Sequence, residues 1–169
     1  TSAADHSAGP ATTAAPNPDP GGVTGTEMTW ARQQSGYLTD LALMMANDPQ
    51  VAMTRHGFTQ PLRRDVLRML TGTGRRERAG HVAATERAAA IHGGTGSMLQ
   101  QLRDSVTLVA PGGVYTRTTG LSPVVVVGRN GLPLPVPSEV QVLGQNGVPL
   151  SRQPAALPAK GSVTLQLNS

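Results

Sequence analysis

A chain of 169 residues is long enough for one domain, or for one domain with an appendage. Only 38% of its residues are hydrophobic and 2% are aromatic, so its core must be modest and built mainly from Val, Leu, Met and Ala. The absence of cysteine excludes disulfides, thiol chemistry and Cys-ligated zinc, and a net charge of +4 is compatible with an anionic partner without requiring one.

Residues 1–26 are mostly Thr, Ser, Ala, Gly, Pro and Asp, with almost nothing apolar. Such a segment cannot bury enough surface to offset its ordering entropy, which predicts a disordered linker or tail. The chain begins TSAADHSAG, with neither an initiator Met nor a signal peptide, so we expect a mature form or a fragment of a larger protein. Its apolar runs are too short to cross a membrane.

Residues 27–103 are expected to be helical. Apolar residues of the first segment fall on one face of a helix, namely Trp30, Tyr37, Leu38, Leu41, Met44 and Met45. We expect Thr26 or Thr29 to cap this helix. Asp48-Pro49 should end it, because the residue before a proline avoids the helical conformation.

A second helix is expected to start near Thr59. Pro61 would then lie in its first turn, where the missing N–H costs no hydrogen bond. The apolar stripe of this helix consists of Leu62, Val66, Met69 and Leu70, and Gly72 or Gly74 should end it.

Glycines interrupt the remainder of the helical region. An Ala-rich helix is predicted from about Glu77 to His92, with a weak stripe of Val82, Ala89 and Ile91. The run HGGTGS, residues 92–97, places glycines ahead of a helix but lacks the GxxxxGK[ST] phosphate-binding pattern and follows no strand. We interpret it as a flexible connector to a short helix over residues 97–103.

From residue 104 the hydrophobic period changes from helical to two, which predicts a small antiparallel β-sandwich. The strand SVTLVA should point Val106, Leu108 and Ala110 inward, and GVYTRTT should follow the turn at residues 111–113. The four valines at 124–127 predict a central strand that is apolar on both faces.

Two further signals lie in the last thirty residues. Asn146-Gly147 stands between two strand-like runs, which favours a hairpin. The final run SVTLQLN alternates, and it should turn Val163, Leu165 and Leu167 inward.

Prolines occupy every second position after the valines, at Pro133, Pro135 and Pro137. In an extended chain, alternate residues point their N–H groups toward the same neighbour, so this side of the segment offers no donors. We therefore expect residues 132–136 to form an edge strand with a blunted outer side. A polyproline-like connector between two sheets is the alternative.

No residue set indicates an enzyme, a metal or a cofactor. The histidines, His6, His56, His81 and His92, do not pair at ligand spacing, and we expect surface or helix-end positions for them. There is no GxSxG elbow, no Ser/His/Asp arrangement and no carboxylate pair in an apolar setting. We expect a protein without catalytic residues, metal or cofactor, unless a catalytic half precedes residue 1.

Six arginines within sixteen residues form the sharpest charge feature: Arg63, Arg64, Arg68, Arg75, Arg76 and Arg78. They are candidate contacts for an anionic glycan, a lipid head group or an acidic protein face. The simpler interpretation, which we favour, is a solvated helix face neutralised by Asp65, Glu77 and Glu86. Nucleic acid is not expected, because aromatics are few and no reading motif is present.

Three stretches carry a family resemblance: QPLRRDVLRML, SVTLVAPGGVYTRTTGLSPVVVVGRNGLPLPVPSEVQVL and LPAKGSVTLQLN. Their PLR-DVLR helix, PGG-YT turn, SP and N-LP-PV strand pair and PA-GS strand cover about residues 60–169. They resemble the C-terminal part of a family of large, uncharacterised actinobacterial envelope proteins, often encoded beside the lipid II flippase. Val124, Gly128 and the extra Gly131 depart from the family pattern. The resemblance implies an Ig-like sandwich in the extracytoplasmic space and a connection with cell-wall assembly, and it implies no catalytic residue.

Together these observations predict an α+β protein with a tail (1–26), an N-terminal helical region (27–103) and a C-terminal antiparallel Ig-like β-sandwich (104–169). We expect a non-catalytic structural or protein-interaction domain of an exported, mycobacterial-type envelope protein, in the periplasm or envelope, anchored if at all through a part not present here. Its partner would be another envelope protein or the rest of a larger chain.

Proline-free edge strands, residues 105–110 or 162–168, and the arginine-rich helix are the expected contact surfaces. Two alternatives stay open. One is a glycan- or lipid-linked-glycan-binding module that uses Trp30 and Tyr115, and the other is an accessory fragment of a larger hydrolase.

Overall fold

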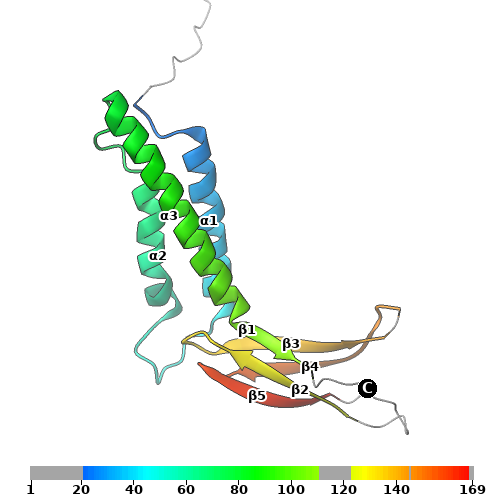
Figure 1. Ribbon diagram of the computed structural model, residues 1–169. Coiled ribbons are helices and arrows are strands. Elements are labelled where there is room, and N and C mark those ends of the chain that lie inside the picture. Colours follow the sequence, from blue (N-terminus) through cyan, green and yellow to red (C-terminus); the bar gives the residue numbers. More distant parts are fainter. Residues whose placement is uncertain (1–20, 111–122, 145, 168–169) are drawn as a thin grey trace, which may run out of the picture.

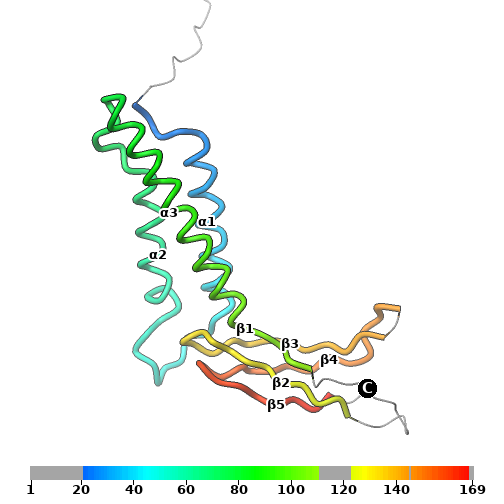
Figure 2. The backbone as a smooth tube through the Cα atoms, viewed as in Figure 1, coloured from blue at the N-terminus to red at the C-terminus, as the bar shows by residue number. Residues whose placement is uncertain are grey.

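The computed structural model describes residues 21–110, 123–144 and 146–167. Within these ranges three helices precede five strands, so the fold class is α+β (Figure 1): α1 (Gly25–Met44), α2 (Arg55–Met69), α3 (Arg78–Asp104), β1 (Val106–Val109), β2 (Val124–Asn130), β3 (Val136–Leu143), β4 (Pro149–Leu157) and β5 (Gly161–Leu167). The helices form a bundle, and the strands extend from one end of it, which gives the molecule an L shape (Figure 2). The predicted tail up to residue 20 and the predicted strand GVYTRTT lie outside the described residues.

Helix α1 begins with a capping box that the sequence analysis missed. The Thr24 hydroxyl accepts from the Glu27 N–H at 3.2 Å, and the Glu27 carboxylate accepts from the Thr24 N–H at 2.7 Å. The prediction of Thr26 or Thr29 as the cap is therefore wrong, although Thr24-x-x-Glu27 is itself the sequence signature of this box. The helix ends at Met44, before the predicted stop at Asp48-Pro49.

Helix α2 begins at Arg55, earlier than predicted, because the Thr54 hydroxyl accepts from the Gly57 N–H at 3.0 Å. Pro61 consequently lies inside the helix rather than in its first turn. Proline removes one backbone hydrogen bond there. Burial of a stripe on another face of the helix offsets that loss: Thr59, Leu62, Val66 and Met69. The helix ends at Met69, ahead of the two glycines expected to stop it.

Helix α3 is continuous through HGGTGS, so the predicted connector and the separate short helix are both wrong. Its buried residues, Ala84, Ala88, Thr95 and Leu99, follow one another at steps of four, seven and four, which is one helical face. This face packs on α1 and α2, and its burial outweighs a glycine penalty of about 1 kcal/mol per residue. The stripe predicted from Val82 and Ala89 was out of phase, since both side chains are exposed. His92 lies well inside the helix, not at its end.

The strands form two antiparallel sheets, β1-β2-β5 and β3-β4. Both sheets contribute to one apolar cluster, so they pack against each other: Val126, Leu165 and Leu167 from the first sheet, and Val140 and Ala155 from the second. The hairpin between β3 and β4 is confirmed, with the Gly144 N–H donating to the Val148 carbonyl at 2.9 Å. Gly147 supplies the positive φ that the turn requires.

Burial confirms the predicted faces of β5 and corrects those of β1 and β2. Leu165 and Leu167 are buried and Val163 is half-buried, whereas the alternate residues Ser162, Thr164 and Gln166 are exposed. Leu108 of β1 is 53% exposed and Ala110 is also exposed, so the inward orientation predicted for both is wrong. Strand β2 is central in its sheet, as predicted. It is not buried on both faces, however, since Val125 is 38% exposed and the described residues cover only one face of the sheet at this position.

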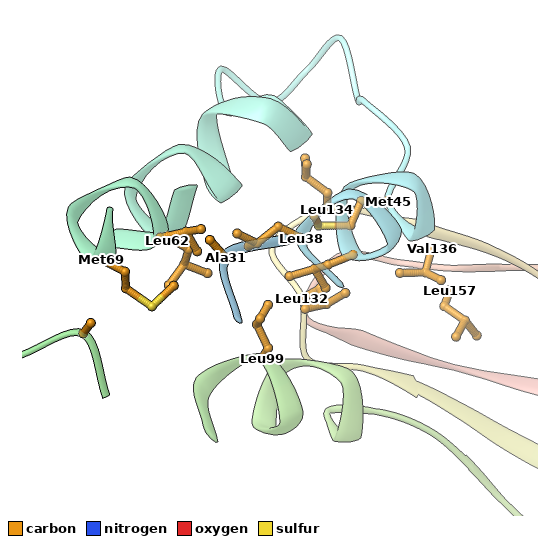
Figure 3. Close-up of a cluster of buried hydrophobic side chains, with 13 residues drawn as sticks. Ala31, Leu38, Met45, Leu62, Met69, Leu99, Leu132, Leu134, Val136 and Leu157 are labelled. Carbon is orange, nitrogen blue, oxygen red and sulfur yellow. The ribbon is translucent and has the colours of Figure 1, made fainter. Parts of the chain in front are cut away.

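Residues 131–135 join the sheets to each other and to the bundle. They connect β2 of one sheet with β3 of the other, which agrees with the alternative of a connector between sheets rather than with an edge strand over 132–136. Leu132 and Leu134 are fully buried, and their side chains lie among those of Leu38, Met45 and Leu99 from the helices (Figure 3). The Ala46 N–H, just beyond α1, donates to the Pro135 carbonyl at 2.8 Å.

Asn130 holds this junction in place. Its amide group donates to the carbonyls of Leu134 at 2.9 Å and Pro158 at 3.0 Å, and its oxygen accepts from the Leu132 N–H at 2.9 Å. The side chain is 2% exposed, so these bonds replace all of its contacts with water.

Candidate interaction surfaces

The six arginines do not form one contact surface, because five of them reach the surface on or beside α2 and α3 and the sixth, Arg75, is buried. Arg68 pairs with Asp65 at 2.8 Å, and Arg63 donates to the Thr39 hydroxyl at 3.4 Å. Arg64, Arg76 and Arg78 are exposed. The Arg68 pair matches the interpretation of a solvated, locally neutralised helix face.

Arg75 is an interior residue and is not available to an anionic partner, which corrects its inclusion in the arginine cluster. It is 1% exposed and bonds Glu27, itself fully buried, through two nitrogens at 2.9 and 3.0 Å. It also donates to the carbonyls of Thr71 and Met69. This bidentate pair ties the start of α1 to the connection between α2 and α3.

The environment of Glu27 keeps its carboxylate ionised. Burial alone would raise the pKa of Glu27, but the hydrogen bonds from Arg75 and Thr24 and the Arg75 charge together hold it below its ordinary value of 4.5. The pair is therefore a structural ion pair, and its carboxylate is shielded from any ligand.

The edges of the β3-β4 sheet are blunted by proline. Pro137 lies opposite Ala156, and Pro154 lies opposite Glu139. Hydrogen-bonded and non-hydrogen-bonded pairs alternate along an antiparallel ladder, so these two pairs, two residues apart, belong to the same one of the two types. Because proline has no N–H, both must be non-hydrogen-bonded pairs, in which the backbone nitrogens point away from the partner strand. Of the three prolines at period two, only Pro137 lies in a strand, where it removes a donor from the outer edge of β3. Pro154 does the same for β4.

The outer strands of the β1-β2-β5 sheet, in contrast, contain no proline. The N–H of Gly131, the residue after β2, donates to the Ser105 carbonyl at 2.9 Å, so it points toward the β1 side. Because successive residues of a strand point their N–H groups to opposite sides, this bond shows which residues of β2 face β1 and which face β5. From the register, β5 turns the N–H groups of Val163 and Leu165 toward β2 and those of Ser162, Thr164 and Gln166 outward. On β1, the Leu108 N–H points outward.

These outward donors form the candidate surface. Among the described residues no strand pairs with the outer side of β5 or of β1. The β5 edge is the longer of the two, and the side chains of its three outward-facing residues are exposed. An unpaired, proline-free edge is a template on which another extended chain can add a strand.

The aromatic residues proposed for glycan binding are separated. Trp30 is half-buried and stacks on His92, with ring centroids 4.6 Å apart and ring planes at 6°. Tyr115 lies outside the described residues. Tyr37, which the sequence analysis placed on the apolar face of the first helix, is instead exposed, and the guanidinium carbon of Arg103 lies 6.0 Å from its ring centroid.

Residues that could hold a metal do not gather anywhere in the described part of the chain. No group of three or more His, Asp or Glu side chains is close enough to share an ion there. None of the helices in these ranges has the length and hydropathy that a membrane span requires. Comparisons with protein-family models, with curated proteins and with solved structures find no match.

Proposed function

We propose that this chain is a non-catalytic protein-interaction domain that binds an extended segment of a partner protein along the outer edge of β5. The observation that carries the proposal is the distribution of proline. The β3-β4 sheet has prolines that remove outward donors, whereas β5 keeps all of its outward N–H groups and exposes the side chains beside them. One sheet is thus protected against edge pairing, while the outer side of β5 is unpaired among the described strands, and this contrast favours β5 as the place where a strand adds.

The wider setting is also part of the proposal. The resemblance over residues 60–169 supports a place in an exported envelope protein, in the extracytoplasmic space, and a connection with cell-wall assembly. Two packed antiparallel sheets support an Ig-like sandwich as the finer description of residues 104–169. The partner would be another envelope protein or a further part of a larger chain. The exposed arginines of α2 would add attraction for an acidic or anionic surface.

A proline substitution on β5 tests the interaction. Thr164→Pro removes one outward N–H and leaves the pairing of β5 with β2 intact, while Thr164→Val keeps the donor and changes only the side chain. Peptides selected from a displayed random library against the wild type should bind Thr164→Val with unchanged affinity and lose at least about tenfold with Thr164→Pro.

Matching circular dichroism and thermal unfolding of the two variants would show that β5 is still in place. If no peptide is selected, or if selected peptides bind both variants equally, strand addition at β5 is wrong. Accessibility of the chain to protease added outside intact cells tests the envelope location separately. Complete protection there would contradict the location without bearing on the edge.

A further inference from the structure

The β5 edge is open in composition as well as in pairing. Strand β5 reads GSVTLQL and contains neither a charged residue nor a proline. It forms the lower border of the strands in Figure 1. Edge strands are usually protected by proline, as in the β3-β4 sheet, or by charged side chains, above all lysine. A second strand laid along β5 therefore meets no charge and no missing donor.

The outward-facing residues of β5 are symmetric about Thr164. Ser162, Thr164 and Gln166 turn their N–H groups away from β2. When a second β5 lies antiparallel to the first with Thr164 opposite Thr164, Ser162 of each copy lies opposite Gln166 of the other. All three positions then form hydrogen-bonded pairs, and each pair exchanges two backbone bonds. The edge is thus complementary to itself under a two-fold rotation, the commonest symmetry of protein oligomers.

Side chains and charges agree with this register. The three side chains are exposed and uncharged, so Thr164 meets Thr164 in a favourable cross-strand pair and the Ser162 hydroxyl meets the Gln166 amide. The basic residues beside the strand, Lys160 and Arg129, both lie at the Ser162 end of β5. That end points away from the same end of the second copy, which places the two Lys160 residues about 27 Å apart at about 3.4 Å per residue. Charges at that distance are screened, because the Debye length at physiological salt is about 8 Å.

We propose that two copies of this chain join through their β5 edges into one continuous sheet, β1-β2-β5 of one copy followed by β5-β2-β1 of the other. The inference rests on the proposed function, because it takes the β5 edge as the place where a strand adds, and it names a second copy as a partner that fits this edge. The contact is one pair of short strands, smaller than the interface of an obligate dimer, so the dimer dissociates on dilution. A segment of another protein competes with the second copy for the same edge.

Sedimentation equilibrium of the full chain, from about 5 µM to about 1 mM, measures the association. The wild type should pass from monomer to dimer within this range. Thr164→Val keeps the outward donor and should dimerise like the wild type. Thr164→Pro removes one donor from each copy at the two-fold axis and should dimerise at least about tenfold more weakly, with β5 still paired to β2.

A charge exchange tests the register. Thr164 faces itself only when the two-fold axis passes through it, so Thr164→Lys and Thr164→Glu each place like charges directly opposite each other. Each variant alone should be monomeric. An equimolar mixture places Lys opposite Glu and should dimerise at least about tenfold more tightly than either variant alone. The mixture contains the same two proteins, so a folding defect cannot produce this pattern.

Thr107 provides the matched control, since it is exposed on β1, at the opposite edge of the same sheet. Thr107→Lys and Thr107→Glu change the net charge equally and should dimerise like the wild type. Loss of association in these two variants, or species larger than dimers, would indicate that β5 pairs with β1 of the next copy. Such head-to-tail pairing gives an open chain of molecules, and the two-fold dimer would be wrong.

The outcomes separate the second copy from strand addition in general. A wild type that stays monomeric up to about 1 mM, yet binds selected peptides along β5, would reject the second copy and leave the proposed function standing. Dimers that persist unchanged in Thr164→Pro, or a mixture of the charged variants that associates no better than its components, would also overturn the inference. A wild type that neither dimerises nor binds peptides would reject the open β5 edge itself.

Discussion

At the scale of single residues, three buried polar side chains, Glu27, Gln34 and Asn130, determine how the parts of the molecule meet. Glu27 and Gln34 both stand on the buried face of α1, among Ala31, Leu38 and Leu41. A polar residue in step with an apolar stripe is a signal that can be read from sequence, because burial forces it to find a partner. The partners themselves, Arg75 and His92, could not be predicted, since they are 48 and 58 residues away and depend on how the helices pack.

The buried ion pair makes stability depend on pH. The pKa of Glu27 in the folded state lies below its ordinary value, so its contribution is present at pH values above 4.5 and is lost as the pH falls through the lowered value. Glu27→Gln leaves the Arg75 charge buried without compensation. It should destabilise the protein at pH 7 by about 3–5 kcal/mol and reduce the loss of stability on acidification. Urea unfolding at a series of pH values measures both effects.

The exposed pair of α2 is the control for that experiment. Asp65→Asn removes a carboxylate that also bonds an arginine, but in water-accessible surroundings. It should change the free energy of unfolding by less than about 1 kcal/mol at any pH. If Glu27→Gln changes the free energy of unfolding as little as Asp65→Asn does, the Glu27–Arg75 pair is not shielded from water in the way the structure indicates.

Asn130 provides a second prediction at this scale. Asn130→Asp keeps the acceptor for the Leu132 N–H but removes the donors to the Leu134 and Pro158 carbonyls. We expect a loss of about 3 kcal/mol in urea unfolding, because buried carbonyls lose their partners. Asn146→Asp is the matched control, since its side chain only accepts from the Val148 N–H and is exposed. Equal effects of the two changes would contradict the buried role of Asn130.

At the scale of elements, amphipathic pattern and turn chemistry predicted more than local propensity did. The presence of the first two helices, the apolar stripe of α2, the Asn-Gly hairpin and the alternation of β5 were predicted correctly, because each depends on residues close in sequence. Propensity failed at Pro61 and at the glycines after His92, where the chain stays helical. Long-range packing of α2 and α3 decided those positions, and no local rule contains it.

Two glycines of α3 allow a test of whether residues 92–97 are helical, as in the structure, or form the flexible connector predicted from the sequence. Gly93 and Gly94 have open space where a Cβ would be, and both are exposed. Replacing both by alanine should raise the free energy of unfolding by about 1–2 kcal/mol, as expected inside a helix. Thermal unfolding measures the gain. No change, or a loss, would indicate that this stretch is not helical.

Gly80 is the internal comparison for that series. A Cβ at Gly80 would overlap the carbonyl oxygen of Gly74, in the connection between α2 and α3. Gly80→Ala should therefore destabilise the protein even though it also lies in α3 and gains helix propensity.

At the scale of the whole molecule, the bundle and the sheets share one apolar cluster. It combines helical residues with Leu132, Leu134, Val136 and Leu157. The sequence indicated a helical region followed by strands, but not that the proline-rich segment would pack its leucines into the bundle. Leu132 and Leu134 alternate with prolines, and only the positions of the helices show which neighbours bury them.

Shortening Leu132 tests whether the two parts unfold together. Leu132→Ala should cost about 2–5 kcal/mol, because it leaves a cavity where bundle and sheets meet. Unfolding followed by Trp30 fluorescence, which reports on the helices, should coincide with unfolding followed by the β signal in circular dichroism, in the wild type and in the variant. Val125→Ala, on an exposed face of β2, should change stability by less than about 0.5 kcal/mol. Separate transitions for the two signals in the wild type would mean that the shared cluster does not couple them.

The L shape of the chain has a consequence for the space beside the β5 edge. Helix α3 leads into β1, and β5 lies on the far side of β2 from β1, so about 10 Å of sheet separates the β5 edge from the end of the helix. A strand added along β5 would extend the sheet away from β1 and from the end of α3, so the helical bundle would not limit the size of the added segment.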